Sequence, residues 1–228
     1  MTRTASSHPV FARVFERLRP AMDRHGVAEH RRRSLSGLAG RVVEIGAGDG
    51  ANFAYYPAAV TGVLAVEPEP YLRVAAARHA TRSTIPIEVV AGAAEQLPAA
   101  DGSFDAAVVS LVLCSVGDQR LALSEIFRVL RPGGELRFYE HVAAPPGSTL
   151  ARVQRIADAT VWPWFFGGCH AGRDTVAAIE AAGFVIDELD RFAFPPGQPS
   201  PASPHVVGRA TRPASPGAPG VNRSWGRT

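Results

Sequence analysis

The sequence predicts an α/β protein with one seven-stranded sheet, mostly parallel with an antiparallel last strand, and with helices on both faces. Three observations predict this fold. Short apolar runs alternate with helical patterns through residues 40–183, which is typical of parallel strands joined by crossover helices. The first run passes into a turn with three glycines. The last two runs follow each other with no helix between them, so they are predicted to pair as a hairpin.

Five strands are predicted in the parallel part of the sheet, each bounded by turn residues. They are residues 41–45, 62–66, 87–90, 104–110 and 135–141. A helix is predicted over residues 118–130 with Leu121, Ile126 and Val129 facing the core. Another helix is expected to begin at Asp174 or Thr175 and to end at Gly183.

The last two strands are predicted at residues 184–194 and 205–211, joined by a loop rich in Pro, Gly and Ser. We expect the final strand to insert antiparallel beside the fifth. Residues 213–228 are mostly Pro, Gly, Ala and Ser. Such a segment buries too little apolar area to offset its ordering entropy, so a disordered tail is predicted there.

The N-terminal residues 1–39 show apolar side chains at helical spacing, interrupted by Pro20 and Gly26, which predicts two short helices. They are a candidate lid, with Phe11 on the apolar underside that would contact a ligand. The alternative is a helix that simply covers the sheet edge. Residues 31–33 are three consecutive arginines, which we interpret as a solvated helix face rather than a phosphate contact.

The glycine turn is the first candidate binding element. Gly46, Gly48 and Gly50 permit positive φ and remove three Cβ atoms at the strand-to-helix corner, where open α/β sheets bind nucleotide-like ligands. Glu67 ends the next strand, where an acid can accept hydrogen bonds from both ribose hydroxyls. The alternative interpretation is a tight turn packed on its own helix.

Two ligands compete for this corner: a dinucleotide, and an adenosine compound that carries a sulfonium and an amino acid. Glu44 and Asp49 flank the loop. Anions there would repel a pyrophosphate but suit the ammonium and sulfonium of S-adenosylmethionine. The GxGxG spacing also differs from the dinucleotide GxGxxG pattern. We therefore predict S-adenosylmethionine as the cofactor. Its predicted contacts are Glu44, Gly46, Gly48, Gly50, Asn52, Glu67, Pro68, Ala94, Glu95, Leu111 and Val112.

The order of these segments resembles the class I S-adenosylmethionine-dependent methyltransferases over residues 40–212. Closer similarity is to the methyltransferase-like thiol S-methyltransferases. The segments that carry it are residues 111–116, 140–143, 168–169 with Arg173, and 204–208. This resemblance implies a Rossmann-like seven-stranded methyltransferase sheet and a thiol acceptor. Animal members of the family begin with a hydrophobic membrane anchor, whereas residues 1–33 here are rich in arginine, so we expect no integral membrane segment.

Methyl transfer is a displacement at carbon, so the protein mainly brings a nucleophile to the methyl group and excludes water. A thiol has a pKa of roughly 8.5, so a small lowering of this pKa suffices to ionise it at neutral pH, whereas a phenol needs a positioned base. His141 follows the fifth strand and is the predicted catalytic base; the alternative is a structural histidine that supports a loop. Neighbouring Glu140 is expected to point to the opposite face of the sheet, because side chains alternate along a strand.

The acceptor is predicted to contact Phe11, Cys114, Trp162, Phe166, Cys169 and Arg173. We interpret Cys114 as a small wall residue rather than a nucleophile. The aromatic segment 162–166 is either an acceptor pocket or core packing. Arg173 either steers an anionic group or pairs with an acid.

Composition excludes several classes. The formal charge of +3 depends on four arginines after Phe194 that no acid accompanies, so nucleic acid is not an expected partner. Two cysteines make no disulfide framework, and we expect reduced thiols. The adjacent Cys169 and His170 lack further ligands at suitable spacing, so no metal is predicted.

No apolar run is long enough to cross a bilayer, and no signal peptide is evident, which favours a cytoplasmic protein. We expect it to be a monomer or a homodimer. The leading hypothesis is a methyltransferase acting on a small apolar acceptor, with S-methylation of a thiol preferred. One alternative is C- or O-methylation of a quinone or phenolic metabolite. The other is a protein that binds S-adenosylmethionine without catalysis.

Overall fold

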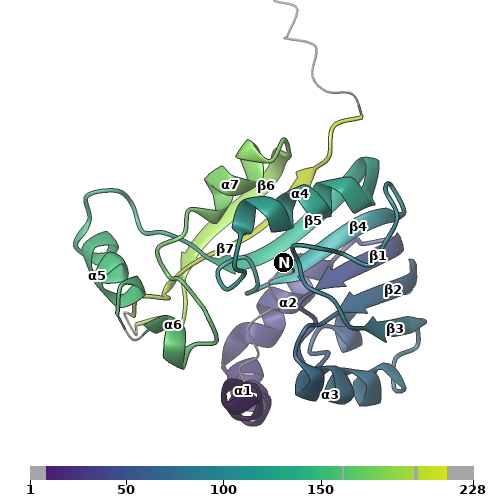
Figure 1. Cartoon of the computed structure of the whole chain (residues 1–228), viewed down its shortest axis with the longest axis horizontal. Coiled ribbons are helices and arrows are strands. Elements are labelled where there is room, and N and C mark those ends of the chain that lie inside the picture. The colour runs from purple at the N-terminus through teal and green to yellow at the C-terminus, as the bar shows by residue number, and fades with distance from the viewer. Residues whose placement is uncertain (1–8, 161, 198–199, 215–228) are drawn as a thin grey trace, which may run out of the picture.

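A computed structural model describes residues 9–160, 162–197 and 200–214. Its centre is a seven-stranded sheet with the order β3-β2-β1-β4-β5-β7-β6 (Figure 1). The strands are β1 (Gly40–Ile45), β2 (Val60–Val66), β3 (Ile87–Val90), β4 (Phe104–Ser110), β5 (Leu130–His141), β6 (Val185–Ala193) and β7 (Pro204–Thr211). The first five are parallel, and β7 runs antiparallel to both β5 and β6. The predicted fold class and the reversed final hairpin are therefore confirmed.

The register brings the carboxyl ends of the central strands to one edge. Ile45, the last residue of β1, pairs with Val66 at the end of β2 and with Val109 near the end of β4. On the other side of β4, His141 at the end of β5 lies opposite His205 of β7. Residues that directly follow β1, β2, β4 and β5 are thus neighbours in space, as an open α/β sheet requires for a binding site.

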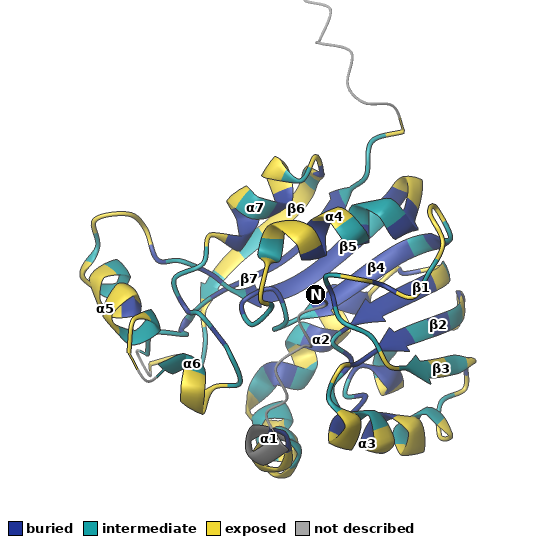
Figure 2. Ribbon diagram, in the orientation of Figure 1, coloured by how far each residue is buried: buried dark blue, intermediate teal, exposed yellow. Residues whose placement is uncertain are grey.

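Helices cover both faces of the sheet (Figure 1). They are α1 (Pro9–Met22), α2 (Ala28–Leu35), α3 (Pro70–Ala80), α4 (Gln119–Val129), α5 (Thr149–Asp158), α6 (Trp162–Phe165) and α7 (Thr175–Ala181), with a 3-10 turn η2 (Phe53–Tyr55). Alternate residues of β1 enter different cores: Val43 packs in a cluster with α4 and α7, and Val42 in a cluster with α2 and α3. The central strands are the most buried part of the ribbon (Figure 2). Full burial of each such Val, Leu or Ile contributes about 1.5–3 kcal/mol.

The N-terminal segment differs from its prediction. Pro20 lies inside α1, and the helical path continues past it to a kink within η1 (Asp23–Val27), after which α2 begins. The break occurs at Gly26, whose φ of 116° is one that L side chains rarely adopt. The expected break at Pro20 was wrong, and the break at Gly26 was right.

Helix α4 matches its prediction, with Ile126 and Val129 buried, except at Leu121. Asp118 caps it by accepting a hydrogen bond from the Leu121 amide at 2.9 Å. Leu121 is 43% exposed, whereas Ala122 and Leu123 are fully buried beside Ile126. The inward orientation predicted for Leu121 was wrong, because the first turn of a capped helix was aligned from apolar character alone.

The arginine run on α2 does not form a uniformly solvated face. Arg31 is 5% exposed and donates from Nη1 to Asn52 Oδ1 at 3.1 Å. Its Nε also lies 3.5 Å from Asp23 Oδ1. Arg32 and Arg33 are about half exposed, as predicted for all three. Within the part of the chain that the structure describes, every helix is too short or too polar to cross a membrane. The predicted tail falls outside the described residues from position 215 onward.

Candidate active site

The glycine loop follows β1 and adopts the conformation that the sequence predicted. Gly46, Gly48 and Gly50 have φ of 66°, 59° and 83°. A Cβ built on Gly46 would lie 2.6 Å from Cγ2 of Val112, in the segment after β4. No side chain fits at that position without displacing this neighbour. The loop is therefore pressed against residues predicted to contact the cofactor.

Glu67 ties the end of β2 to this loop. Its side chain is 5% exposed, with Oε2 accepting the Gly48 amide at 2.8 Å and Oε1 accepting the Glu69 amide at 2.8 Å. Burial raises the pKa of Glu67, while these two amides lower it. A carboxylate has about four acceptor positions, so each oxygen retains capacity for a further hydrogen bond. Two oxygens held beside a loop without side chains fit the two hydroxyls of a ribose.

Glu44 and Asn52 form a closed network beneath the loop. Glu44 accepts hydrogen bonds from Asn52 Nδ2 at 2.9 Å and from the Tyr56 hydroxyl at 2.7 Å. Burial raises the pKa of Glu44 to about 7, although both hydrogen bonds lower it. Asn52 in turn accepts from Arg31. This network organises the corner, and direct contact of Glu44 or Asn52 with the cofactor stays a prediction.

The charge argument that selected the cofactor needs correction. Asp49 is fully buried, and its Oδ2 accepts a hydrogen bond from Arg19 Nε of α1 at 2.5 Å. Because Arg19 pairs with Asp49, and because Asn52 and Tyr56 already donate to the two oxygens of Glu44, neither acid is a free anion beside the loop. Helix α1 supplies this counter-ion, and its position was not evident from the sequence. Glu67 is the acid that remains available.

The segment after β4 is held by an acid that the sequence analysis had directed away from the site. Glu140 is fully buried, and its Oε1 accepts the amides of Val112 at 2.8 Å and Leu113 at 3.1 Å. Its Oε2 accepts the Cys114 amide at 3.3 Å. Burial raises the pKa of Glu140 to about 7 against these hydrogen bonds. The available signal was an acid next to the end of a strand, directly after Phe138 and Tyr139.

Leu111 is the first residue of this segment and has a φ of 60°. Among the described residues, it is the one residue other than glycine with a positive φ. Its amide donates to the Tyr139 carbonyl at 2.7 Å. Such a conformation costs energy and is concentrated at functional sites. Together with the three amides bound by Glu140, it turns Val112 toward the glycine loop.

Arg173 binds the same segment from the other side. Its Nη1 donates to the carbonyls of Leu113 at 2.9 Å and Val116 at 2.7 Å. Neither role proposed from the sequence describes these contacts, since the partners are carbonyl oxygens rather than a carboxylate or a ligand anion. Arg173 therefore positions the segment, and its contact with an acceptor stays a prediction.

The remaining predicted cofactor residues lie near the same edge. Glu95 accepts the amides of Gly117 and Asp118 through Oε1, at 2.9 and 3.2 Å. Ala94 is buried in the core, and the carbonyl of exposed Pro68 accepts from Arg73 at 2.9 Å. Their contact with cofactor stays a prediction.

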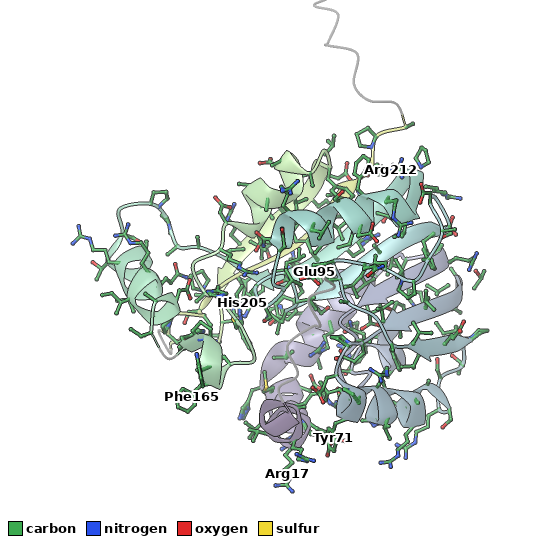
Figure 3. The ribbon with its side chains drawn as sticks, in the orientation of Figure 1. Arg17, Tyr71, Glu95, Phe165, His205 and Arg212 are labelled. Carbon is green, nitrogen blue, oxygen red and sulfur yellow. The ribbon has the colours of Figure 1, made fainter. Side chains whose placement is uncertain are left out.

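Cys114, His141 and Cys169 converge at the ends of β4 and β5. Their potential ligand atoms all lie within 4.8 Å of one another, and Cys169 Sγ is 3.4 Å from His141 Nδ1. Both cysteines are free and buried, as predicted. His141 also packs edge-on against His205 of β7, with ring centroids 4.5 Å apart; Figure 3 labels His205.

The three groups differ in their protonation. The contact with Cys114 lowers the pKa of Cys169, whereas the same contact and burial raise the pKa of Cys114. Burial lowers the pKa of His141, but contacts with Cys114 and Glu140 outweigh it and the pKa is raised. The prediction of no metal had weighed only Cys169 with its neighbour His170. Folding instead brings Cys114 and His141 close to Cys169.

The aromatic segment is split between two environments. Trp164 and Phe165 are 86% and 71% exposed, and Figure 3 shows Phe165 projecting from α6. Core packing was therefore the wrong interpretation for these two residues. Trp162 stacks on Phe166 with centroids 4.0 Å apart, and it contributes to the lowered pKa of Cys169. Phe11 lies in α1, but its side chain is outside the described part of the structure.

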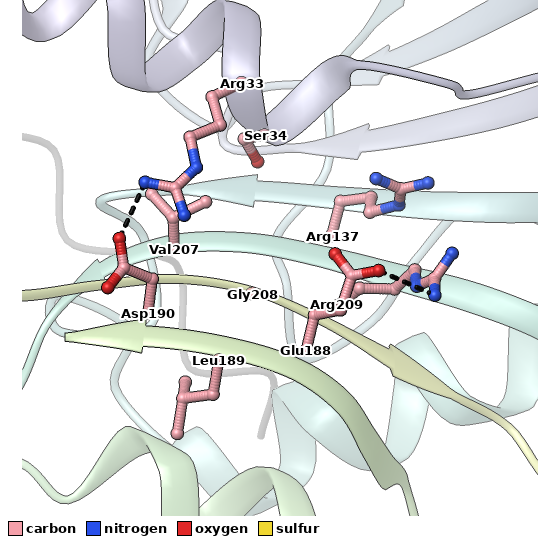
Figure 4. A pocket seen from close by; sticks show the side chains of 9 residues that line it. All are labelled: Arg33, Ser34, Arg137, Glu188, Leu189, Asp190, Val207, Gly208 and Arg209. Carbon is pink, nitrogen blue, oxygen red and sulfur yellow. Dashed lines mark hydrogen bonds and ion pairs between the residues drawn. The ribbon is translucent and has the colours of Figure 1, made fainter.

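A hollow of about 320 Å³ lies between α2, β5, β6 and β7 (Figure 4). Its charged groups pair with one another, Arg33 with Asp190 at 2.7 Å and Arg209 with Glu188 at 2.9 Å. No residue predicted for the active site lines it.

Comparison with known proteins identifies the family of the chain. Residues 43–138 match the methyltransferase domain family. The human thiol S-methyltransferase TMT1B is 38% identical over 188 residues, covering 79% of this chain and 75% of that protein. A demethylmenaquinone methyltransferase of Renibacterium salmoninarum is 35% identical over 96 residues, 42% of this chain and 39% of that protein. The solved structure of geranyl diphosphate methyltransferase in complex with SAM superposes with a TM-score of 0.63 at 16% identity, covering 82% of this chain and 85% of that chain.

The fold and the matched methyltransferase domain define a methyltransferase that uses S-adenosylmethionine, and the contact of Glu67 and the glycine loop with this cofactor stays a prediction. The predicted cofactor is confirmed, and the alternative of a non-catalytic binding protein was wrong. The chain belongs to the thiol S-methyltransferase family, as its sequence resemblance indicated.

Proposed function

We propose that this enzyme methylates the sulfur of a small apolar thiol. The observation that carries the proposal is the extent of similarity to thiol S-methyltransferase TMT1B. A match covering 79% of the chain necessarily includes Cys114, His141 and Cys169. The 96 residues shared with the demethylmenaquinone methyltransferase are too few to reach from Gly46 to Cys169. The match to the thiol relative therefore spans the acceptor side as well as the cofactor side.

The roles of the chain's own residues follow from their contacts. Glu67 and the glycine loop would hold S-adenosylmethionine, which supplies an electrophilic methyl group on a sulfonium. Glu140 and Arg173 position the segment 111–116 between this loop and the acceptor side. Trp162, stacked on Phe166, offers an apolar surface beside Cys169. A thiol needs only loss of its proton to become a strong nucleophile, so this side requires little other machinery.

A panel of acceptors tests the proposal. Formation of S-adenosylhomocysteine is measured with alkyl and aryl thiols, and in parallel with phenols and quinols of matched shape. We expect turnover with thiols and little with the oxygen analogues. Turnover confined to oxygen or carbon acceptors would replace the proposal with its alternative.

The second candidate function is C- or O-methylation of a quinone or phenolic metabolite, which the similarity to demethylmenaquinone methyltransferase favours. A phenol, with pKa near 10, requires a base, and His141 is the candidate. Under this function His141→Ala slows a phenol far more than an acidic thiol. Equal rates for wild type and variant on both acceptors would make His141 structural.

Further predictions accompany the proposed function. We expect a cytoplasmic enzyme, a monomer or homodimer, that acts without nucleic acid. We also propose that α1 serves as a lid over the cofactor, supported by the contact between Arg19 and Asp49 in the glycine loop.

A further inference from the structure

Two thiols and one imidazole meet at the acceptor side in the arrangement of a metal site. Cys114 comes from the segment after β4, His141 ends β5, and Cys169 lies in the loop before α7. In a tetrahedral zinc site, with Zn–S near 2.3 Å and Zn–N near 2.1 Å, neighbouring ligand atoms are about 3.5–3.8 Å apart. The observed separation of Cys169 Sγ and His141 Nδ1, 3.4 Å, is close to that edge. All three ligand atoms fall within 4.8 Å.

The ligand set selects the kind of metal. Two cysteines and a histidine are soft and borderline ligands that favour zinc over magnesium or calcium, which prefer oxygen. Two thiolates also balance the charge of Zn²⁺, so a neutral imidazole leaves a buried site without net charge. A buried ion without such compensation would be costly. Burial of both cysteines is therefore compatible with a bound cation.

The three proposed metal ligands lie on segments that separate hydrogen bonds hold in place. Cys114 donates its amide to Glu140 Oε2 at 3.3 Å, and its carbonyl accepts the His170 amide at 2.8 Å. The loop after Cys169 is fixed to α5, where Asp158 accepts the amides of Ala171 at 2.7 Å and Gly172 at 2.9 Å. Supporting contacts of this kind orient metal ligands and hold them in place.

Gln154 completes the support from α5. It is 1% exposed, accepts the Ala144 amide at 2.8 Å, and donates to the carbonyls of Val142 and Ala171 at 3.1 and 3.0 Å. One buried amide side chain thereby joins the segment after His141 to the segment after Cys169. Two of the three ligand segments are coupled without any metal.

The group has three members, and this number determines what it can do. Among the described residues no fourth His, Cys, Asp or Glu belongs to it. Structural zinc sites have four protein ligands, whereas catalytic sites have three and keep one position for water or substrate. The Cys114–Cys169–His141 set matches the second kind.

We propose that Cys114, His141 and Cys169 bind one zinc ion whose fourth position takes the acceptor thiol as a thiolate. The inference deepens the proposed function and rests on it for the identity of the acceptor. On binding, the acceptor S–H bond breaks, its electron pair stays on sulfur and forms the Zn–S bond, and the proton passes to solvent. A coordinated thiol is deprotonated outright. In the zinc-bound enzyme His141 is a ligand rather than a base, so ionisation of the acceptor requires no basic side chain.

The first experiment measures metal content. Protein reduced with a phosphine is dialysed against Zn²⁺, freed of excess, and analysed by mass spectrometry of the metal. We expect about one zinc per chain, with Cys114→Ser and Cys169→Ser each reducing it at least tenfold. His170→Ala is the matched control, because His170 adjoins Cys169 but is outside the group. Binding of S-adenosylhomocysteine, measured by calorimetry, shows that each variant remains folded.

The second experiment examines the open position. Co²⁺ replaces zinc, and its absorption reports sulfur ligation and coordination number. Addition of a small alkyl thiol should change the spectrum, whereas the corresponding alcohol should not. The same titration with Cys169→Ser protein should show no thiol-dependent change.

The proposal is overturned if reduced wild-type protein holds no zinc, if His170→Ala loses as much zinc as Cys169→Ser, or if thiol leaves the cobalt spectrum unchanged. Unaltered thiol methylation by fully metal-free protein would overturn it while leaving the proposed function intact. Conversely, zinc bound through these residues in a protein that methylates only oxygen acceptors would reject the proposed function. The acceptor part of the inference would fail with it, and the metal site would stand.

Discussion

The cofactor corner and the acceptor cluster differ in how the chain builds them. The cofactor corner consists of the glycine loop and Glu67, which follow two successive strands and are joined by one short hydrogen bond. The acceptor cluster consists of Cys114, His141 and Cys169, which three separate segments bring together. A corner made by adjacent elements carries a recognisable local pattern, whereas a cluster made by distant elements carries none.

The two regions also depend on different physical features. In the cofactor corner the backbone is decisive, since positive φ and the absence of Cβ atoms shape the loop. In the acceptor cluster the side-chain chemistry is decisive, and buried contacts of Glu140, Gln154 and Asp158 set its geometry. Substitutions should therefore affect stability and cofactor binding in the first region, and acceptor chemistry in the second.

The largest effect is expected from Gly46→Ala. The added Cβ would lie 2.6 Å from Val112 Cγ2, and the alanine would have to adopt a φ of 66°. Backbone strain and overpacking together should lower the free energy of unfolding by about 3 kcal/mol. Urea denaturation measures this loss, and calorimetry with S-adenosylhomocysteine should show at least tenfold weaker binding.

Gly147→Ala is the matched control for this change. Gly147 has φ of 82° but no atom within 4 Å of an added Cβ. Only the backbone strain remains, so the loss should be about 1 kcal/mol with unchanged cofactor affinity. Equal losses for the two variants would show that contact with Val112 is unimportant.

The next effect is the pH dependence caused by Glu44, whose pKa is raised by burial from 4.5 to about 7. The folded state holds this proton more tightly than the unfolded state does. The free energy of unfolding should therefore fall as pH rises from about 4.5 to about 7, by about 3 kcal/mol from this group, and then level off. Urea denaturation of Glu44→Gln across this range should show a shallower fall.

Glu180→Gln, on the exposed face of α7, should retain the wild-type pH profile. Burial also raises the pKa of Glu140 to about 7. Part of the fall in the free energy of unfolding should therefore persist in Glu44→Gln. A variant profile identical to that of wild type would mean that Glu44 is ionised throughout.

Glu67→Ala sharpens the assignment of the ribose contact. Loss of a charged acceptor should weaken binding of S-adenosylhomocysteine at least tenfold, or about 1.4 kcal/mol. Glu88→Ala, which removes an exposed acid from β3, should bind as wild type does. Unchanged affinity in Glu67→Ala would leave Glu67 with the structural role of holding the Gly48 and Glu69 amides.

The smallest effect is expected on the acceptor side, from Trp162→Ala. Removal of the ring stacked on Phe166 should raise the KM for an aryl thiol about three- to tenfold, with little change in cofactor affinity. Trp164→Ala, at a side chain that is 86% exposed, should leave KM unchanged. If both variants raise KM equally, the aromatic contact with acceptor extends over the outer face of α6.

Much of the fold could be predicted because its signals are local. Apolar runs bounded by turn residues identified the strands, and the missing helix before β7 predicted the antiparallel insertion. Leu121 was misplaced because apolar character alone does not reveal which side of the first helical turn faces the core. Trp164 was misplaced because large aromatic residues occupy cores, pockets and surfaces alike.

The candidate site was only partly predictable for a related reason. Cys114, His141 and Cys169 were each named, but their meeting was not foreseen, since nothing in their spacing specifies a common point. Glu140 was directed to the opposite face by strand alternation, although a carboxyl at a strand end can reach the backbone of the neighbouring loop. The pairing of Arg19 with Asp49 depends on how α1 packs over the sheet.

The sequence alone determined the sheet, its reversed hairpin and the glycine corner, because backbone conformation and alternating apolar patterns act over a few residues. Tertiary structure decided which acids are neutralised, which arginine is buried, and that two cysteines and a histidine converge. These outcomes depend on distances between segments far apart in the chain, and such distances exist only once the sheet has aligned its strand ends.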